Sequence, residues 1–203
     1  FFNVILSYGM ETAFFRFYNT EENKNKVIST ATISLFWSTI GFLALFLLFR
    51  KNLALWSQIN VEYIVFTIWI LAFDALAIIP FSKIRAESRP IKYAVIKISN
   101  VLINLSLNIF FLVFLPKLAA NSDTIFIQTI YYDDFQIGYI FVANLIASLI
   151  TLWIVLPDYF KIKWQFDADL WQKMMQYGLP ILIAGIAFAI NEHFDKILLD
   201  WMH

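Results

Sequence analysis

Residues 190–199 read I-N-E-H-F-D-K-I-L-L and place several charged side chains at the end of an otherwise apolar segment. A metal site is disfavoured, because E-H-x-D lacks the paired histidines of H-E-x-x-H and the chain has no cysteine. Nothing resembles a catalytic triad. Glu192 and Lys196 have the i, i+4 spacing at which opposite charges pair on a helix, with Asp195 on their flank. Two interpretations remain, the polar end of a membrane helix or a charged cluster at the outer end of a cavity-lining helix, and we favour the second.

A second candidate site is a ladder of polar residues in the segment 91–115. Lys97, Asn100, Asn104 and Asn108 lie within about 80° of one another on a helix. Asparagines in a membrane helix commonly hydrogen-bond to a neighbouring helix. A ladder with a lysine at one end also suits an aqueous cavity that receives an anionic substrate, and we favour this interpretation. A weaker stripe of the same kind follows at Asn144, Ser148 and Thr151.

Three more charges interrupt apolar segments. A charge near the bilayer centre costs roughly 2.5–3.5 kcal/mol on insertion scales, so each needs a partner or a water-filled cavity. Glu11 and Arg16 are separated by about 140° around a helix and should meet different neighbours. We expect Arg16 to reach the headgroups and Glu11 to face a cavity. Asp74 is either ion-paired across helices or protonatable, and Pro80 should loosen its helix locally.

The composition is that of an integral membrane protein. Of 203 residues, 61% are hydrophobic and only 15% are charged, against about 25% in a typical soluble domain. Formal net charge is zero, so charge gives no argument for nucleic-acid binding. A spanning helix needs about 20 apolar residues. Six segments qualify, which predicts an all-α polytopic membrane helix bundle: 1–18, 27–49, 61–81, 91–115, 137–156 and 176–201.

The distribution of lysine and arginine predicts the orientation. Loops 19–26, 82–90 and 157–175 are richer in basic residues than the loops between them, so we expect them to be cytoplasmic. Residues 164–176 have the pattern of a short amphipathic helix on that face. The chain begins inside an apolar segment and ends just after a charged cluster, and we expect it to be an internal piece of a longer protein.

Four stretches, in this order along the chain, resemble bacterial oligosaccharide flippases. They are Y-G-M-E-T-A-F-F-R-F (8–17), R-A-E-S-R-P-I-K-Y (85–93), Y-G-L-P-I-L-I-A-G (177–185) and D-K-I-L-L (195–199). These flippases form the polysaccharide transporter branch of the multidrug/oligosaccharidyl-lipid/polysaccharide exporter superfamily. The resemblance implies two lobes with twelve to fourteen helices, of which this chain would supply about the second to seventh. Residues 1–163 would be five helices of the N-terminal lobe, and residues 164–203 the amphipathic connector and first helix of the second lobe.

The resemblance also implies a function. Members of this family move polyprenyl-diphosphate-linked oligosaccharides, such as O-antigen repeat units for lipopolysaccharide, across the bacterial cytoplasmic (inner) membrane by alternating access. The expected partners are the lipid-linked oligosaccharide, membrane lipids and polysaccharide polymerase machinery, with no nucleic acid and no bound cofactor. Candidate cavity residues for the substrate are Arg16, Arg85, Arg89, Lys97, Asn100, Asn104, Asn108 and Lys196. Candidates for protonation or coupling to H⁺ or Na⁺ are Glu11, Asp74, Glu192 and Asp195.

Two other functions remain open. A cation-coupled multidrug exporter of the same superfamily would favour carboxylates in its cavity, whereas the ladder here carries Lys97. An integral-membrane enzyme acting on lipid-linked sugars would usually carry catalytic residues in a sizeable outer loop. Loop 117–136 offers only Y-Y-D-D at 131–134, which is more typical of an interfacial anchor.

Overall fold

The computed structural model describes residues 6–121, 131–132, 135–160 and 162–201, and the side chains in these ranges apart from 120–121, 189 and 192–201. All regular structure in these ranges is helical. Four of its helices are long and apolar enough to cross a membrane: α3 (Lys24–Leu48), α5 (Val61–Ala86), the helix from Pro90 to Ala119, and α9 (Gln136–Phe160). They match four of the six predicted spans, and they fit a multi-pass membrane protein.

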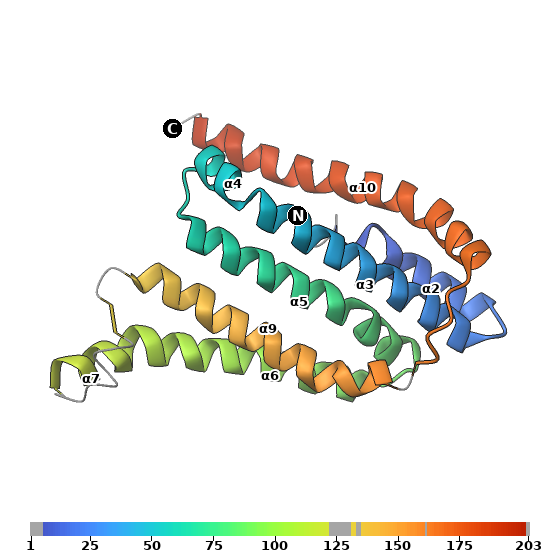
Figure 1. The fold of residues 1–203 in the computed structure, drawn as a ribbon, viewed down its shortest axis with the longest axis horizontal. Helices are drawn as coiled ribbons and strands as arrows, with labels where there is room; N and C mark the ends of the chain where they lie inside the picture. Colours follow the sequence, from blue (N-terminus) through green and yellow to red (C-terminus); the bar gives the residue numbers. More distant parts are fainter. Residues whose placement is uncertain (1–5, 122–130, 133–134, 161, 202–203) are drawn as a thin grey trace.

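The long helices alternate in direction along the bundle (Figure 1). α10 (Ala168–Trp201) packs on α2 (Met10–Thr20) and α3, α3 packs on α5, α5 on α9, and α9 on α6 (Pro90–Ile109). The connections that follow α2, α5 and α9 therefore meet at one end, on the right in Figure 1. These are the basic loops, so we call this the basic end. The short helix α4 (Arg50–Ser57) and helix α7 (Leu115–Asn121) lie at the opposite end, and the π-helix η1 (Phe110–Phe114) joins α6 to α7.

The first and last predicted spans differ from expectation. Residues 1–18 do not form one helix, because Tyr8 and Gly9 adopt positive φ angles of 36° and 73° and α2 starts only at Met10. With 11 residues, α2 is too short to cross a bilayer. The predicted connector helix and the predicted sixth span are instead one continuous helix, α10, which passes through Pro180. The count of six spans and the division into two lobes stay predictions.

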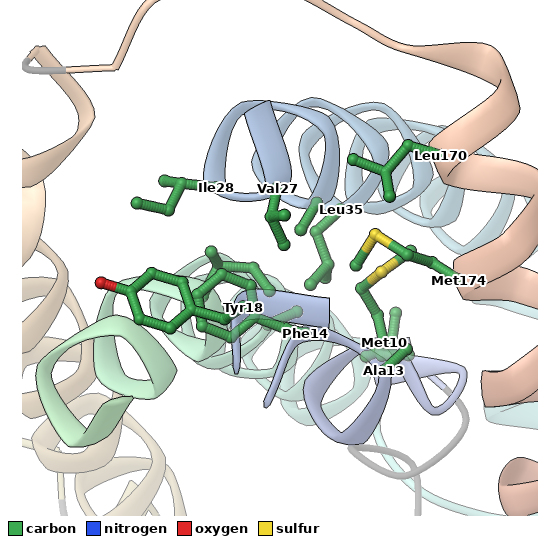
Figure 2. Close-up of a cluster of buried hydrophobic side chains, with 13 residues drawn as sticks. Met10, Ala13, Phe14, Tyr18, Val27, Ile28, Leu35, Leu170 and Met174 are labelled. Atoms are coloured by element: carbon green, nitrogen blue, oxygen red, sulfur yellow. The ribbon is translucent and has the colours of Figure 1, made fainter. Parts of the chain in front are cut away.

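A buried apolar cluster holds α2 between α3, α5 and α10 (Figure 2). On α2, Met10, Ala13 and Phe14 recur at the spacing of one helical face and are almost fully buried. Leu170 and Met174 reach the same cluster from α10. Burial of these side chains anchors the short helix α2 in the bundle, although its length cannot span the membrane.

Pro80 lies inside α5 without ending the helix. Proline has no N–H, so the carbonyl oxygen of Leu76, four residues earlier, loses its usual helical partner. The hydroxyl of Tyr159 on α9 donates a hydrogen bond to that oxygen. In a membrane, a neighbouring side chain commonly restores such a lost bond. The expected loosening at Pro80 is therefore offset by α9.

An extended strap, residues 162–167, connects α9 to α10 at the basic end and is fastened to the start of α3. The Ser29 hydroxyl donates to the Lys163 carbonyl at 2.5 Å and accepts the Gln165 N–H at 2.8 Å. The Thr30 hydroxyl accepts the Asp167 N–H at 3.2 Å. Asp167 also forms an ion pair with Lys26. These contacts fix the position at which α10 begins.

Asp167 caps α10, and its replacement by asparagine should destabilise the protein at pH 7. Its Oδ1 accepts the Leu170 N–H at 2.7 Å, and this bond, followed by the Lys26 ammonium, lowers the pKa of the carboxyl. A lowered carboxyl pKa adds stability above the ordinary value, and that stability is lost as the pH falls through the folded-state pKa. Thermal melts from pH 7 to pH 3 should therefore converge for the wild type and Asp167→Asn at the acidic end. A constant difference across this range would contradict the role of the ionised carboxylate.

The orientation across the membrane can be tested with single cysteines, because the chain has none of its own. Asn23 and Ser88 lie in two turns at the basic end. If this end is cytoplasmic, Asn23→Cys and Ser88→Cys should resist a membrane-impermeant thiol reagent in intact cells and react after lysis. Ser57→Cys at the other end should react in both. Labelling of the first two variants in intact cells would show that the protein has the opposite orientation.

Candidate functional site

A polar cavity of about 400 Å³ lies among α5, α6, α9 and the start of the α2 segment. Each long helix contributes residues at the spacing of a single face. These are Asp74, Ala77, Ile78, Phe81 and Arg85 on α5, Tyr93, Lys97 and Asn100 on α6, and Asn144, Ser148 and Thr151 on α9, with Ser7 and Glu11 from the N-terminal segment. The volume is within the range of small-molecule sites. Three helices that fit membrane spans, together with the α2 segment, thus enclose a water-accessible, charged space.

Glu11 and Arg85 form an ion pair across the cavity wall. The Arg85 guanidinium also lies over two aromatic rings, 4.9 Å from the Phe15 centroid and 5.4 Å from the Tyr93 centroid. Cation–π contact and pairing with a carboxylate both favour a charged arginine in a partly desolvated position. Arg85 therefore enters the cavity as part of a neutral pair.

Lys97 is the cation of the cavity that lacks such neutralisation. Its Nζ atom lies 4.6 Å from the centroid of the Phe81 ring. None of the ion pairs between described side chains includes it. Lys97 is two turns into α6, so it presents a positive charge within a helix that is otherwise suited to lipid.

Hydroxyls, an amide and a second carboxylate also line the cavity. The Ser148 hydroxyl donates to Asp74 at 2.9 Å, which joins α9 to α5. Asn100 donates to the Thr151 hydroxyl at 2.8 Å and to the Ala147 carbonyl at 3.2 Å, which joins α6 to α9. These hydrogen bonds orient the polar groups that line the space.

One asparagine of the ladder lines the cavity, as one interpretation predicts, and the other two form hydrogen bonds with neighbouring amides, as the other predicts. Asn100 lines the cavity, but Asn104 and Asn108 do not. Asn104 donates to the side-chain oxygen of Asn144 at 3.1 Å, and Asn108 donates to that of Asn104 at 2.5 Å. The first of these bonds joins α6 to α9, as is common between membrane helices, and the second lies within α6.

The other predicted site residues lie elsewhere. Arg16 and Glu11 meet different helices, as their spacing predicts: the Arg16 guanidinium lies 4.2 Å from the centroid of the Tyr177 ring on α10, and Glu11 pairs with Arg85 on α5. Arg89 is in the turn between α5 and α6, and its Nε atom lies 3.3 Å from a Glu87 carboxylate oxygen. Neither lines the cavity. The side chains of Glu192, Asp195 and Lys196 lie outside the described residues.

Sequence reasoning missed several lining residues. Phe81 and Tyr93 look like ordinary apolar positions, yet each is a helical turn or two from a polar lining residue: Phe81 is seven after Asp74, and Tyr93 is four before Lys97. Extending the polar stripes by i±4 and i±7 could have found them. Within the part of the chain that the structure describes, no three His, Cys, Asp or Glu side chains gather as a metal site.

The Glu11–Arg85 pair should behave as a unit under mutation. Glu11→Gln leaves the Arg85 charge uncompensated, and Arg85→Gln does the same to Glu11, so each single variant should be less stable than the wild type by up to about 1 kcal/mol, as for other half-exposed pairs. The double variant should recover part of that loss, because neither charge is left alone. Thermal unfolding of the four proteins in detergent measures the coupling. Additive single effects would show that the pair contributes nothing.

Comparison with known proteins adds no assignment, since no family model, no curated protein and no solved structure matches this chain. The fold and the cavity therefore define only a class: an all-helical protein that fits a multi-pass membrane location and has a charged cavity between its helices.

Proposed function

We propose that the protein translocates a lipid-linked oligosaccharide with a diphosphate head across the bacterial cytoplasmic membrane for surface polysaccharide assembly. The observation that carries the proposal is the Lys97 ammonium, which lines a polar cavity between membrane-spanning helices and takes part in none of the ion pairs between described side chains. Such a position is costly without a compensating anion or water, and intramembrane charges commonly mark substrate pathways. A diphosphate would supply the anion.

The neighbours of Lys97 support the same chemistry. Asn100 and Asn144 line the cavity with amide groups, and Ser148 and Thr151 with hydroxyls. Amides and hydroxyls can bond both to phosphate oxygens and to sugar hydroxyls. The rings of Phe81 and Tyr93 lie beneath Lys97 and Arg85 and hold these two cations at the cavity. A lipid tail would remain in the surrounding bilayer while the head enters this space.

Asp74 is the candidate for coupling transport to H⁺ or Na⁺. It lines the cavity together with Lys97 and accepts a hydrogen bond from the Ser148 hydroxyl. A carboxylate in a membrane cavity can exchange a proton or bind a cation with hydroxyl oxygens such as that of Ser148. The two lobes would rock about the site during alternating access.

The carboxylates also favour a second candidate, a cation-coupled multidrug exporter. Asp74 could attract a cationic drug into the same space. The two functions differ in the residue on which they depend, because an anionic head needs Lys97 and a cationic drug does not. Resistance to cationic compounds that Asp74→Asn abolishes and Lys97→Gln leaves unchanged would favour the exporter.

Depletion of the full-length protein tests the proposal directly. The readout is the accessibility of the lipid-linked oligosaccharide to an external glycosidase. Flippase function predicts that complete repeat units accumulate in the inner leaflet and resist the enzyme. Units that appear outside normally, but stay unpolymerised or unmodified, would point instead to an enzyme that acts after translocation.

A further inference from the structure

A second hollow of the surface lies between α3, the strap 162–167 and α10. An apolar groove of about 610 Å³ is lined there mainly by aromatic and aliphatic side chains, among them Ile33, Trp37, Phe166 and Trp171. Trp37 and Phe166 keep 65% and 50% of their surface exposed. The groove thus presents large apolar side chains on a helix that fits a membrane span.

The polar atoms at the base of this groove are already satisfied. The Ser34 hydroxyl accepts the Trp171 indole N–H at 2.7 Å and lies 2.7 Å from the Tyr8 hydroxyl. The groove therefore offers little hydrogen bonding and suits a hydrocarbon chain. An acyl chain of the bilayer is the apolar ligand available to such a surface.

A polar pocket continues the groove toward the basic end. It has a volume of about 140 Å³ and is lined by Asn23, Asn25, Lys26, Ser29, Lys163 and Gln165. Lys26, Ser29, Ile33 and Trp37 follow one another along one face of α3, so pocket and groove share a helix wall. The strap also joins them, because Gln165 lines the pocket and Phe166 lines the groove.

Two lysines line the pocket, Lys26 and Lys163. Asp167 neutralises Lys26, but none of the ion pairs between described side chains includes the exposed Lys163. Lysines close to a membrane surface attract anionic headgroups. Trp164, which is 53% exposed and packs edge-on against Phe36, lies beside Lys163 in the strap, and exposed tryptophans are typical of the headgroup region.

From this juxtaposition we infer that the pocket and groove bind one anionic phospholipid of the leaflet at the basic end, with its phosphate at Lys163 and an acyl chain along Ile33 and Trp37. This site is separate from the polar cavity and does not depend on the proposed transport function. A bound lipid would bridge α3, the strap and the first turns of α10.

Quenching of tryptophan fluorescence by brominated lipids tests the inference. The full-length protein is reconstituted into phosphatidylcholine nanodiscs, and brominated phosphatidylglycerol or brominated phosphatidylcholine is added in steps. We expect half-maximal quenching at a lower fraction of phosphatidylglycerol. Lys163→Gln should reduce this preference by about five-fold, the effect of one basic residue near a membrane surface. Lys117→Gln, an exposed lysine toward the other end, is the matched control and should leave it unchanged.

A second variant tests the contribution of the groove to lipid binding separately from that of the Lys163 charge. Ser38 lines the groove, and Ser38→Leu should partly fill it and weaken phosphatidylglycerol quenching while Lys163 is intact. Equal quenching by both lipids in the wild type would overturn the inference. So would wild-type behaviour of both Lys163→Gln and Ser38→Leu, because the surface would then be covered by protein or contacted only by bulk lipid.

Discussion

Replacing Lys97 with glutamine is expected to reduce export of surface polysaccharide by about 10- to 100-fold at normal protein levels. A hydrogen bond to a charged group contributes about 1.5–3 kcal/mol, and each 1.4 kcal/mol corresponds to a factor of ten. Glutamine keeps much of the length and hydrogen-bonding capacity of lysine but removes the charge. The change should therefore affect an anionic substrate more than the fold.

The control for this experiment is on the same helix. Lys92 forms an ion pair with Asp158, at 3.2 Å, and does not line the cavity. Lys92→Gln removes an exposed pair worth about 0–1 kcal/mol and should leave export nearly unchanged. Lys97→Arg, which keeps the charge, should retain part of the activity. Normal export by Lys97→Gln at the wild-type protein level would refute the role of the cavity in binding an anionic head.

The second large effect is expected at Gly9. Its φ of 73° lies in the left-handed region, and a Cβ atom there would overlap the carbonyl group of Gly178 on α10. Gly9→Ala combines backbone strain of about 1–2 kcal/mol with overpacking of about 1–3 kcal/mol. We expect a loss of about 2–5 kcal/mol, visible as a lower melting temperature and poor recovery as a single species on size exclusion.

The partner glycine provides the comparison. A Cβ on Gly178 would lie 3.1 Å from the Gly9 carbonyl oxygen, a tight contact that a small shift relieves, and Gly178 needs no positive φ. Gly178→Ala should therefore be much milder than Gly9→Ala. Gly41→Ala is the control and should not lower the stability, because nothing lies within 4 Å of the new methyl group. Equal effects at Gly9 and Gly178 would mean that the turn at Tyr8 and Gly9 does not hold α10 by close backbone contact.

The sequence predicted the four long apolar helices well, because the thickness of the bilayer sets their length and their apolar runs are uninterrupted. It was wrong about one continuous helix over residues 1–18. The hydropathy of that segment does not reveal the left-handed turn at Tyr8 and Gly9, although the glycine was a signal for it.

The cavity was predicted in part. Helical periodicity determines which residues of one helix share a face. It was therefore enough to place Lys97 and Asn100 on one face of α6 and the Asn144–Thr151 stripe on one face of α9. It could not show that Glu11 meets Arg85, 74 positions away, or that Asn104 meets Asn144 on α9. Those contacts depend on the relative rotation and depth of packed helices, which one sequence does not specify.

The hydrogen bond between Tyr159 and the Leu76 carbonyl limits bending of α5 at Pro80. Pro80 separates the cavity-facing side of α5 into a part that carries Asp74 and a part that carries Arg85. Bending of α5 at the proline would change the spacing between these two charges. The Tyr159 hydroxyl donates a hydrogen bond to the Leu76 carbonyl oxygen, which has no helical partner because of Pro80. Bending of α5 at the proline therefore has to strain or break this contact with α9. The stiffness of one cavity wall is thus controlled from the neighbouring helix, by a single phenol.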